Sequence, residues 1–145
     1  MSAPQESARP RTSARHKARK HALDLLFECD LRGTDPVATL EERAAGEVTV
    51  RELTSVIVRG VAENVRQIDA TVSEHLADGW TLSRMPVVDR AILRIGIWEI
   101  LYNDAVPHAV AIDEAVEAAK ILSTDDSAGF VNGLLGRIAQ TAPSA

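Results

Sequence analysis

The clearest pattern of hydrophobic and polar positions lies in the middle of the chain, over residues 87–102. Apolar side chains recur there every three or four residues in two neighbouring rows, which is the period of an α-helix. Charged residues interrupt the apolar surface at only four positions, Asp89, Arg90, Arg94 and Glu99. A helix that is apolar around most of its circumference must be surrounded by other elements. The pattern therefore predicts a core helix, and Arg90 and Arg94 are expected at its exposed edge.

The N-terminal part of the chain has the pattern of two helices. The first covers residues 14–31 and ends before Gly33, and the second is short, beginning at Asp35 and Pro36 and closing at Gly46. Aspartate offers an N-cap oxygen and proline fits the first helical position, whereas glycine commonly ends a helix. The inward face of the first helix is expected to hold Ala18, Ala22, Leu25 or Leu26, and Cys29.

A long amphipathic segment follows, over residues 49–76. Its first residues are rich in β-branched side chains, but the helical period continues too far for a strand. Thr49 and Glu52 have the spacing of a capping box, which begins a helix. A segment of this length needs a bend or a break, which we expect near Arg66 or Gln67.

The pattern predicts two more helices after the core helix, which gives six or seven helices and an all-α fold. One begins after Pro107 and the other follows a polar connector at residues 123–127. Three glycines on the last helix are expected to let a neighbouring backbone approach, at a propensity cost of about 1 kcal/mol each. These glycines are Gly129, Gly133 and Gly136. The inward faces are expected to hold Ala109, Ile112, Ala115 or Val116, Ala119 and Leu122 on the first helix, and Phe130, Leu134 and Ile138 on the second.

The composition indicates one helical domain. A chain of 145 residues is long enough for a core of its own, and its aromatic content of 3% and few alternating runs favour helices. We expect a single domain over residues 14–141, between a disordered basic arm at 1–13 and a flexible tail at 142–145. The lone Cys29 cannot form an internal disulfide, and no apolar segment has the length of a signal sequence or a membrane span. These features predict a cytoplasmic protein.

No residue pattern indicates an enzyme. Four scattered histidines and one cysteine give no metal-ligand spacing, and no GK[ST] sequence follows the glycines of the last helix, as a phosphate loop would require. Asp113, Glu114 and Glu117 form a carboxylate cluster, which a solvated face near a helix N-terminus explains better than a catalytic pair does. We therefore expect no catalytic residue, no metal and no cofactor.

The charge is distributed unevenly along the chain. Residues 1–21 carry six basic residues and one acidic residue, whereas the remainder carries 10 basic and 20 acidic residues. Nucleic-acid contacts are therefore expected at the basic end. Four basic residues at the start of the first helix oppose its dipole, which is typical of either a phosphate-binding patch or a solubilising flank. They are Arg15, Lys17, Arg19 and Lys20.

Phe27 lies about two helical turns after these charges. An aromatic side chain there is available to stack on an unpaired base, but it would equally fill the core of a helical protein. The residue pattern alone leaves both interpretations open.

Five separated blocks of the sequence resemble the NusB family of transcription antitermination factors, in the same order and spacing. The resemblance runs from about Arg15 to Ile138. It implies an all-α fold of two packed three-helix subdomains. The blocks are ARHKARKHALDLLF, GVAEN at residues 60–64, DRAILRIGIWEIL at 89–101, VPHAVAIDEAVEAAK at 106–120 and DSAGFVNGLLGRI at 126–138.

The resemblance also implies a function. Members of this family bind a single-stranded boxA element of ribosomal RNA leader transcripts together with NusE, a small-subunit ribosomal protein. With NusA and NusG, the pair helps RNA polymerase to read through termination signals. Matched by position, the RNA-binding residues are Arg15, His16, Lys17, Arg19, Phe27, Asp126 and Phe130, and Lys20 continues the same basic patch.

This chain departs from the family at three of these positions. His16 and Lys17 stand where arginines are usual, and Phe27 replaces the commoner tyrosine. These changes keep the charge and the stacking surface but lose a phenolic hydrogen bond, so a weaker affinity or a different base preference is expected.

A partner face is expected at the head of the core helix. Asp89 and Arg90 are charged and stand before its most apolar part, so we expect them at the exposed end of the helix. An acid in the first turn is also explained by the helix dipole alone. The acidic body of the chain complements a basic partner such as NusE. A homodimer is compatible with the sequence, which carries no marker for one.

Two other interpretations remain open. The same fold is appended to ribosomal RNA cytosine methyltransferases, but no Gly-rich loop for S-adenosylmethionine follows a strand here, so the chain would be a detached binding module. A helix bundle that binds only proteins would use the acidic body and leave the basic arm as a tail. A steep salt dependence of RNA affinity would separate the RNA-binding interpretation from a purely protein-binding one.

Overall fold

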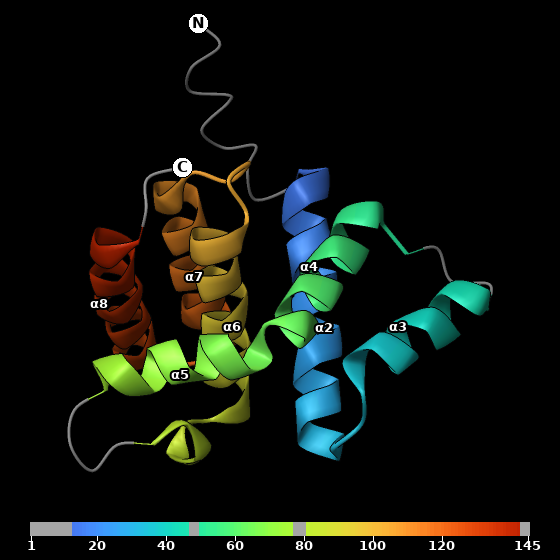
Figure 1. The fold of residues 1–145 in the computed structure, drawn as a ribbon, viewed down its shortest axis with the longest axis horizontal. Coiled ribbons are helices and arrows are strands. Elements are labelled where there is room, and N and C mark those ends of the chain that lie inside the picture. Colours follow the sequence, from blue (N-terminus) through green and yellow to red (C-terminus); the bar gives the residue numbers. More distant parts are fainter. Residues whose placement is uncertain (1–12, 47–49, 77–80, 143–145) are drawn as a thin grey trace, which may run out of the picture. The chain divides into compact units, whose positions relative to one another are not determined.

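The computed structural model describes residues 13–46, 50–76 and 81–142 (Figure 1). Within these ranges the secondary structure consists of seven α-helices and one short 3-10 helix, with no strand, so the predicted all-α fold is confirmed. The elements are α2 (Ala14–Arg32), α3 (Pro36–Ala45), α4 (Glu52–Glu63), α5 (Val65–His75), η2 (Leu82–Arg84), α6 (Val87–Tyr102), α7 (His108–Leu122) and α8 (Asp125–Thr141).

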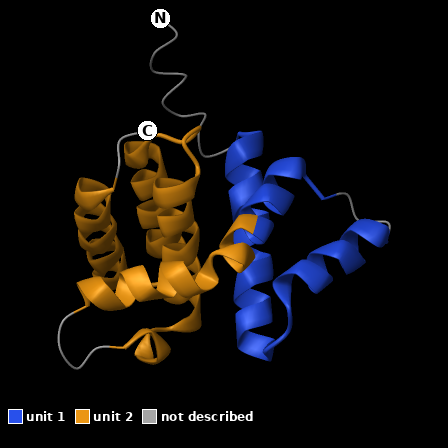
Figure 2. Cartoon of the chain, viewed as in Figure 1, with its two compact units in different colours: residues 1–59 blue, residues 60–145 orange. Residues whose placement is uncertain are grey.

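The chain divides into two compact units, residues 1–59 and residues 60–145 (Figure 2). The described part of unit 1 holds α2, α3 and most of α4. Unit 2 begins within α4, at Gly60, and holds α5, η2, α6, α7 and α8. In unit 2, α6, α7 and α8 pack on one another, and α5 packs on α6 and α8.

In the described residues, the helical region begins with α2 and ends with α8. Helix α2 begins at Ala14 and α8 ends at Thr141. Ser13, the last residue of the predicted arm, is ordered instead, because its side chain caps α2 by accepting a hydrogen bond from the backbone N–H of His16 at 3.1 Å. The rest of the arm and residues 143–145 of the tail lie outside the described residues.

Unit 1 follows its sequence signals closely. The predicted inward face of α2 is confirmed, since Ala18, Ala22, Leu25, Leu26 and Cys29 are all buried. Gly33 ends the helix in the left-handed region, at φ 71°, which glycine adopts without a steric penalty. Helix α3 begins as predicted, with an Asp35 carboxylate oxygen accepting from the N–H of Ala38 at 3.0 Å.

The predicted break in the long amphipathic segment exists, but it lies at Asn64 rather than near Arg66 or Gln67. The side-chain amide of Asn64 donates to the carbonyl oxygen of Gly60 at 2.8 Å. A side chain that bonds to the preceding turn competes with the continuing helix, so the chain ends α4 there and starts α5. Thr49 of the predicted capping box lies outside the described residues.

Helix α6 is the core helix that the pattern predicted, with the same ends. Most of its side chains are buried, although Tyr102 at its last position is 40% exposed. Helix α8 passes so close that a Cβ on Gly96 would stand 2.8 Å from a methyl carbon of Leu135. Two acids expected to interrupt the apolar surface are themselves buried, since Asp89 is 5% and Glu99 is 1% exposed.

The expected inward faces of α7 and α8 are partly wrong. On α7, Ala109 is exposed and Leu122 is 43% exposed, while Ala111, Ala115 and Ala119 form the buried row. On α8, Leu134 and Ile138 are buried but Phe130 is 37% exposed. Alanine and valine are so frequent in α7 that a displaced row fits the same period, and in α8 the adjacent Phe130 and Val131 are alternative inward positions, so only packing decides between the rows.

The expectation that three glycines of α8 let a neighbouring backbone approach is also wrong. A Cβ on Gly129 or Gly136 would meet nothing within 4 Å, and one on Gly133 would meet only the tip of Arg137. The closely packed glycines are Gly96 on α6 and Gly60, where a Cβ would overlap Cε2 and Nε1 of the buried Trp98 indole. The end of α4 can therefore cross Trp98 only without a side chain at this position.

We predict that Gly60→Ala destabilises unit 2 by about 1–3 kcal/mol or more, because the added methyl group must displace a buried ring. Gly136→Ala is the matched control. Its Cβ meets open space on a helix, so it should stabilise the protein by about 0.5–1 kcal/mol. Urea unfolding of both variants measures the difference, and equal stabilities would contradict the close contact between Gly60 and Trp98.

Candidate nucleic-acid interface

The start of α2 presents its basic side chains around the face opposite the core. Arg15, Lys17 and Lys20 are exposed, and His16 and Arg19 are partly buried. Since successive residues are rotated by about 100° in a helix, these five side chains spread over more than half of its circumference and avoid only the buried Ala18 row. They form a basic cap rather than a single stripe.

The charges of this basic cap are only partly neutralised. Lys20 pairs with Asp24 one turn later, at 3.3 Å between Nζ and a carboxylate oxygen, and both side chains are exposed. His16 and Arg19 also take part in polar interactions. The side chains of Arg15 and Lys17 have no hydrogen bond or ion pair with any residue in the described ranges. No acid lies in the first turn, so these two charges remain available to an anion.

Thr54 of α4 and Arg51, the residue before α4, bind to helix α2 within unit 1. Neither residue was identified from the sequence. Thr54 is 3% exposed, and its hydroxyl donates to the carbonyl oxygen of Ala18 at 3.0 Å. The guanidinium of Arg51 lies 3.1 Å from Nδ1 of His21. An arginine can only donate, so His21 is the acceptor of this hydrogen bond. Nothing in the local pattern around Thr54 distinguishes it from an ordinary helix residue.

Phe27 lies on the side of α2 that also carries Lys20 and His16, seven and eleven residues earlier. The Phe27 residue is partly buried. Stacking on a base requires an accessible aromatic surface, and the partial exposure of Phe27 is compatible with that.

In unit 2, the two other predicted RNA-binding residues stand on the outer side of the first turns of α8. Asp126 is exposed and Phe130, one turn later, is 37% exposed. The helix begins at the N-cap Thr124, whose hydroxyl oxygen accepts from the N–H of Ser127 at 3.0 Å. Gly129 and Gly133 flank Phe130 on the helix surface, so two of its neighbours on α8 have no side chain.

Asp89 is not at an exposed end of the core helix, and the prediction of its exposure is wrong. Its carboxylate is buried at the start of α6, where one oxygen accepts a hydrogen bond from the hydroxyl of Ser127 at 2.8 Å. The start of α8 covers this position, which the sequence of α6 alone could not reveal. The structure thus links Asp89 to Ser127, the residue that follows Asp126 in α8.

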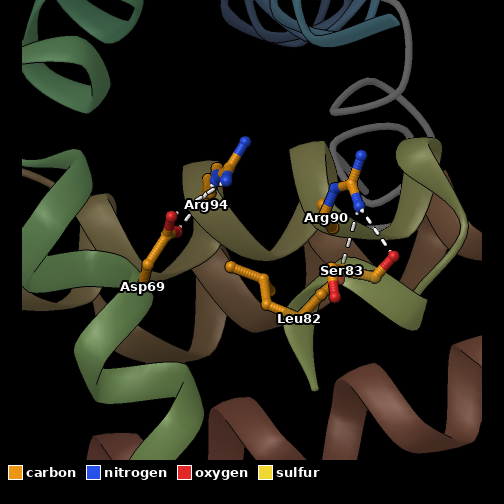
Figure 3. A network of polar contacts seen from close by, with 5 residues as sticks. All are labelled: Asp69, Leu82, Ser83, Arg90 and Arg94. Atoms are coloured by element: carbon orange, nitrogen blue, oxygen red, sulfur yellow. Dashed lines mark hydrogen bonds and ion pairs between the residues drawn. The ribbon is translucent and has the colours of Figure 1, made fainter.

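Arg90 and Arg94 lie one turn apart on α6 and bind different partners (Figure 3). Arg90 is partly buried and donates to the carbonyl oxygens of Leu82 and Ser83, at 3.4 and 3.3 Å, so it holds η2. Arg94 makes a two-pronged ion pair with Asp69 of α5, with both N···O distances 2.9 Å. Both guanidinium groups therefore have roles inside unit 2.

The described residues contain no cluster of three or more histidine, cysteine, aspartate or glutamate side chains that could hold a metal ion. Cys29 is buried and unpaired with any other cysteine. None of the helices in the described ranges has both the length and the apolar character of a membrane span.

Comparison with known proteins follows the same lines as the fold. The family model described as the NusB family matches residues 16–140. A "Transcription antitermination protein NusB" of Leifsonia xyli subsp. xyli is 59% identical over 138 residues, which cover 90% of this chain and 94% of that protein. T. maritima NusB has a similar solved structure, with a TM-score of 0.79 and 36% identity, covering 90% of this chain and 93% of that one.

A second similar solved structure is that of the antitermination factors NusB and NusE in complex with double-stranded RNA. It has a TM-score of 0.73 and covers 85% of this chain and 93% of the matched chain. At 24% identity, this similarity concerns the fold alone.

The seven described helices and the basic start of the first of them define an all-helical protein of the NusB type. Over almost all of its length, from residue 16 to residue 140, this chain belongs to the NusB family.

Proposed function

We propose that this protein is an RNA-binding transcription antitermination factor. In this function it binds single-stranded boxA RNA of ribosomal RNA leader transcripts jointly with NusE and promotes read-through by RNA polymerase. The observation that carries the proposal is the start of α2, where Arg15 and Lys17 have no partner in the described part of the chain and no acid balances them. Its 59% identity to a protein named for antitermination supports the same conclusion.

The candidate side chains on α2 and at the start of α8 suit single-stranded RNA better than double-stranded RNA. Arginine and lysine bind phosphates of either, but exposed aromatic rings are useful where bases are unstacked. The half-buried Phe27 follows the basic cap, and Phe130 stands exposed between two glycines. In the proposed function both rings stack on bases, and Asp126 accepts hydrogen bonds from a base edge.

The proposed protein partner is NusE, and the wider assembly includes RNA polymerase, NusA and NusG. Outside residues 1–21 the chain carries 20 acidic and 10 basic residues, a balance that attracts a basic ribosomal protein. Arg90 remains a candidate for the surface that binds NusE, because its hydrogen bonds to Leu82 and Ser83 position η2. The proposed function is one of binding, without a catalytic step, and it is exercised in the cytoplasm.

The methyltransferase-associated module is the weaker alternative, because the chain covers 94% of a relative named for antitermination. A bundle that binds only proteins leaves the uncompensated charges at the start of α2 without a role. Titration of boxA and scrambled RNA at several salt concentrations, with and without NusE, tests the proposal. Equal affinities for the two RNAs under all these conditions would rule out boxA recognition.

We predict that the double variant Arg15→Ala, Lys17→Ala binds boxA RNA more weakly and with a shallower salt dependence. Each phosphate contact that is lost removes about 0.7 units from the log–log slope for a single strand, so the slope should fall by about 1.4. Both side chains lie outside the core, so thermal stability should hold.

Arg66→Ala, Lys120→Ala is the matched control for that variant. These two residues are exposed on α5 and α7, and their removal changes the net charge by the same amount. An equal loss of affinity in both double variants would indicate a general charge effect instead of a basic cap that binds phosphates.

Phe27→Leu separates stacking from packing. Leucine keeps most of the apolar volume but removes the aromatic face, so a stacking role predicts a loss of RNA binding of about 1–3 kcal/mol with a much smaller change in stability. Fluorescence titration and thermal unfolding of the same sample measure both. Reduced stability with unchanged RNA affinity would remove Phe27 from the site.

Arg90→Ala should weaken NusE binding and leave RNA binding by the isolated protein unchanged. Without its guanidinium the η2 segment loses two hydrogen bonds, and a loosened partner surface must be ordered on binding. Arg94→Ala is the control on the same helix, because it breaks the pair with Asp69 and leaves η2 held. If surface-binding kinetics give both variants the same NusE affinity, η2 has no part in the partner face.

A further inference from the structure

The burial of the Asp89 carboxylate against the start of α8 is energetically unfavourable, and the packing of the helices does not require an acid at this position. Asp89 is 5% exposed, and only one of its oxygens is bonded, by the Ser127 hydroxyl at 2.8 Å. The other oxygen, Oδ1, is buried and has no hydrogen-bond partner in the described ranges. Burying a carboxylate with so few donors is unfavourable, whereas an apolar residue would fill the same space without that cost.

The hydrogen bonds around Ser127 have one consistent direction. A carboxylate only accepts, so the single proton of the Ser127 hydroxyl points at Asp89. The hydroxyls of Ser123 and Thr124, at 3.0 and 3.1 Å, then donate to the two lone pairs of Ser127. Thr124 in turn accepts from the backbone N–H of Ser127. Every donor and acceptor of the Ser127 hydroxyl is therefore used, and hydrogen bonds in such a chain strengthen one another.

This network anchors the turn of α8 that carries two candidate RNA contacts. Ser127 directly follows Asp126 and precedes Phe130 by three residues, within one helical turn. Phe130 is 37% exposed, and its neighbours Gly129 and Gly133 carry no side chains that could contact its ring. The direction of Phe130 and Asp126 thus depends on how the start of α8 sits on α6.

We propose that Asp89 and Ser127 are positioning residues for RNA binding, with Asp89 orienting Asp126 and Phe130 through Ser127. The inference deepens the proposed function and rests on it, because that function assigns Asp126 and Phe130 to the RNA. It also gives Asp89 a role other than direct contact with a partner, in keeping with its burial.

The first test compares Ser127→Ala with Ser123→Ala in RNA titrations of the full chain. Ser127→Ala removes the one hydrogen bond that the Asp89 carboxylate accepts from the described residues, and it should weaken boxA binding about tenfold. Its salt slope should stay at the wild-type value, since no phosphate-binding cation is lost. Ser123→Ala leaves the bond to Asp89 in place and should bind nearly as wild type does. Ser127→Thr, which keeps the hydroxyl, should restore affinity.

A second comparison distinguishes positioning from general stability. Asp69→Asn breaks the ion pair with Arg94 in the same unit, away from the start of α8, and should lower the melting temperature with no loss of RNA affinity. Amide hydrogen exchange should show faster opening only in the first turn of α8 for Ser127→Ala. If Asp69→Asn weakens RNA binding as much as Ser127→Ala does at equal loss of stability, the positioning role is refuted.

Asp89→Asn keeps the shape and an acceptor for Ser127, so it provides a variant that should fold even if Ser127→Ala does not. It should weaken RNA binding less than Ser127→Ala, and the double variant should lose no more than Ser127→Ala alone, because both changes remove one interaction. Additive losses would overturn the inference. Wild-type protein that does not distinguish boxA from scrambled RNA would instead overturn the proposed function, whereas intact boxA preference with wild-type affinity in Ser127→Ala would overturn the inference alone.

Discussion

Unit 2 depends on the burial of α6. A helix whose side chains are apolar on nearly every side cannot lie on a surface, so α5, α7 and α8 must pack against it. This requirement sets the close contacts of the unit. Gly96 lets α8 approach, and Gly60 lets the end of α4 cross the Trp98 ring. A methyl group at either position would push buried side chains apart, because a packed interior has no free volume to receive it.

Because α6 is buried, a polar group on it is unfavourable unless it has a hydrogen-bond partner, and each such partner has a defined position. Arg94 meets Asp69 with two short hydrogen bonds and Arg90 holds two carbonyl groups of the η2 segment, so each arginine ties a neighbouring element to the core helix. Asp89 ties the start of α8 in the same manner. An apolar core specifies volume but not orientation, whereas these hydrogen bonds are directional. They give α5, η2 and α8 defined positions relative to α6.

Several candidate binding residues lie outside the core instead, among them Arg15, Lys17 and Asp126. Arg15 and Lys17 stay in solvent at a helix end where the dipole disfavours them, and Phe130 keeps part of its ring exposed. Binding of an anionic ligand would offset the unfavourable interaction of these cations with the helix dipole. The supporting contacts, such as the hydrogen bond from Thr54 to Ala18, lie behind them and keep the surface ordered. A phosphate-binding surface requires both features, cations without an intramolecular partner and a backbone that is held in place behind them.

Local signals in the sequence determined most of the helices. Ser13, Asp35, Thr124 and Gly33 act within one turn of their own helices, and the apolar period of α6 extends over its whole length, so their effects are independent of the rest of the chain. The basic cap of α2 was equally visible, because charges that belong to a helix end remain at the surface in any packing arrangement. The family resemblance likewise rests on blocks of sequence alone, and the match of the NusB family model to residues 16–140 confirms it.

Tertiary structure decided the positions where two helices compete for one face. Whether Phe130 points inward or outward depends on which alanine row of α7 and which aliphatic row of α8 meet, and several rows have the same period. Asp89 carries the sequence signature of an exposed helix start, yet a segment 38 residues away covers it and supplies its hydrogen bond. The break at Asn64 and the buried hydroxyl of Thr54 similarly depend on a particular carbonyl oxygen being within reach. Periodicity shows that a helix has a buried side, but only contact between helices determines which polar groups that side must satisfy.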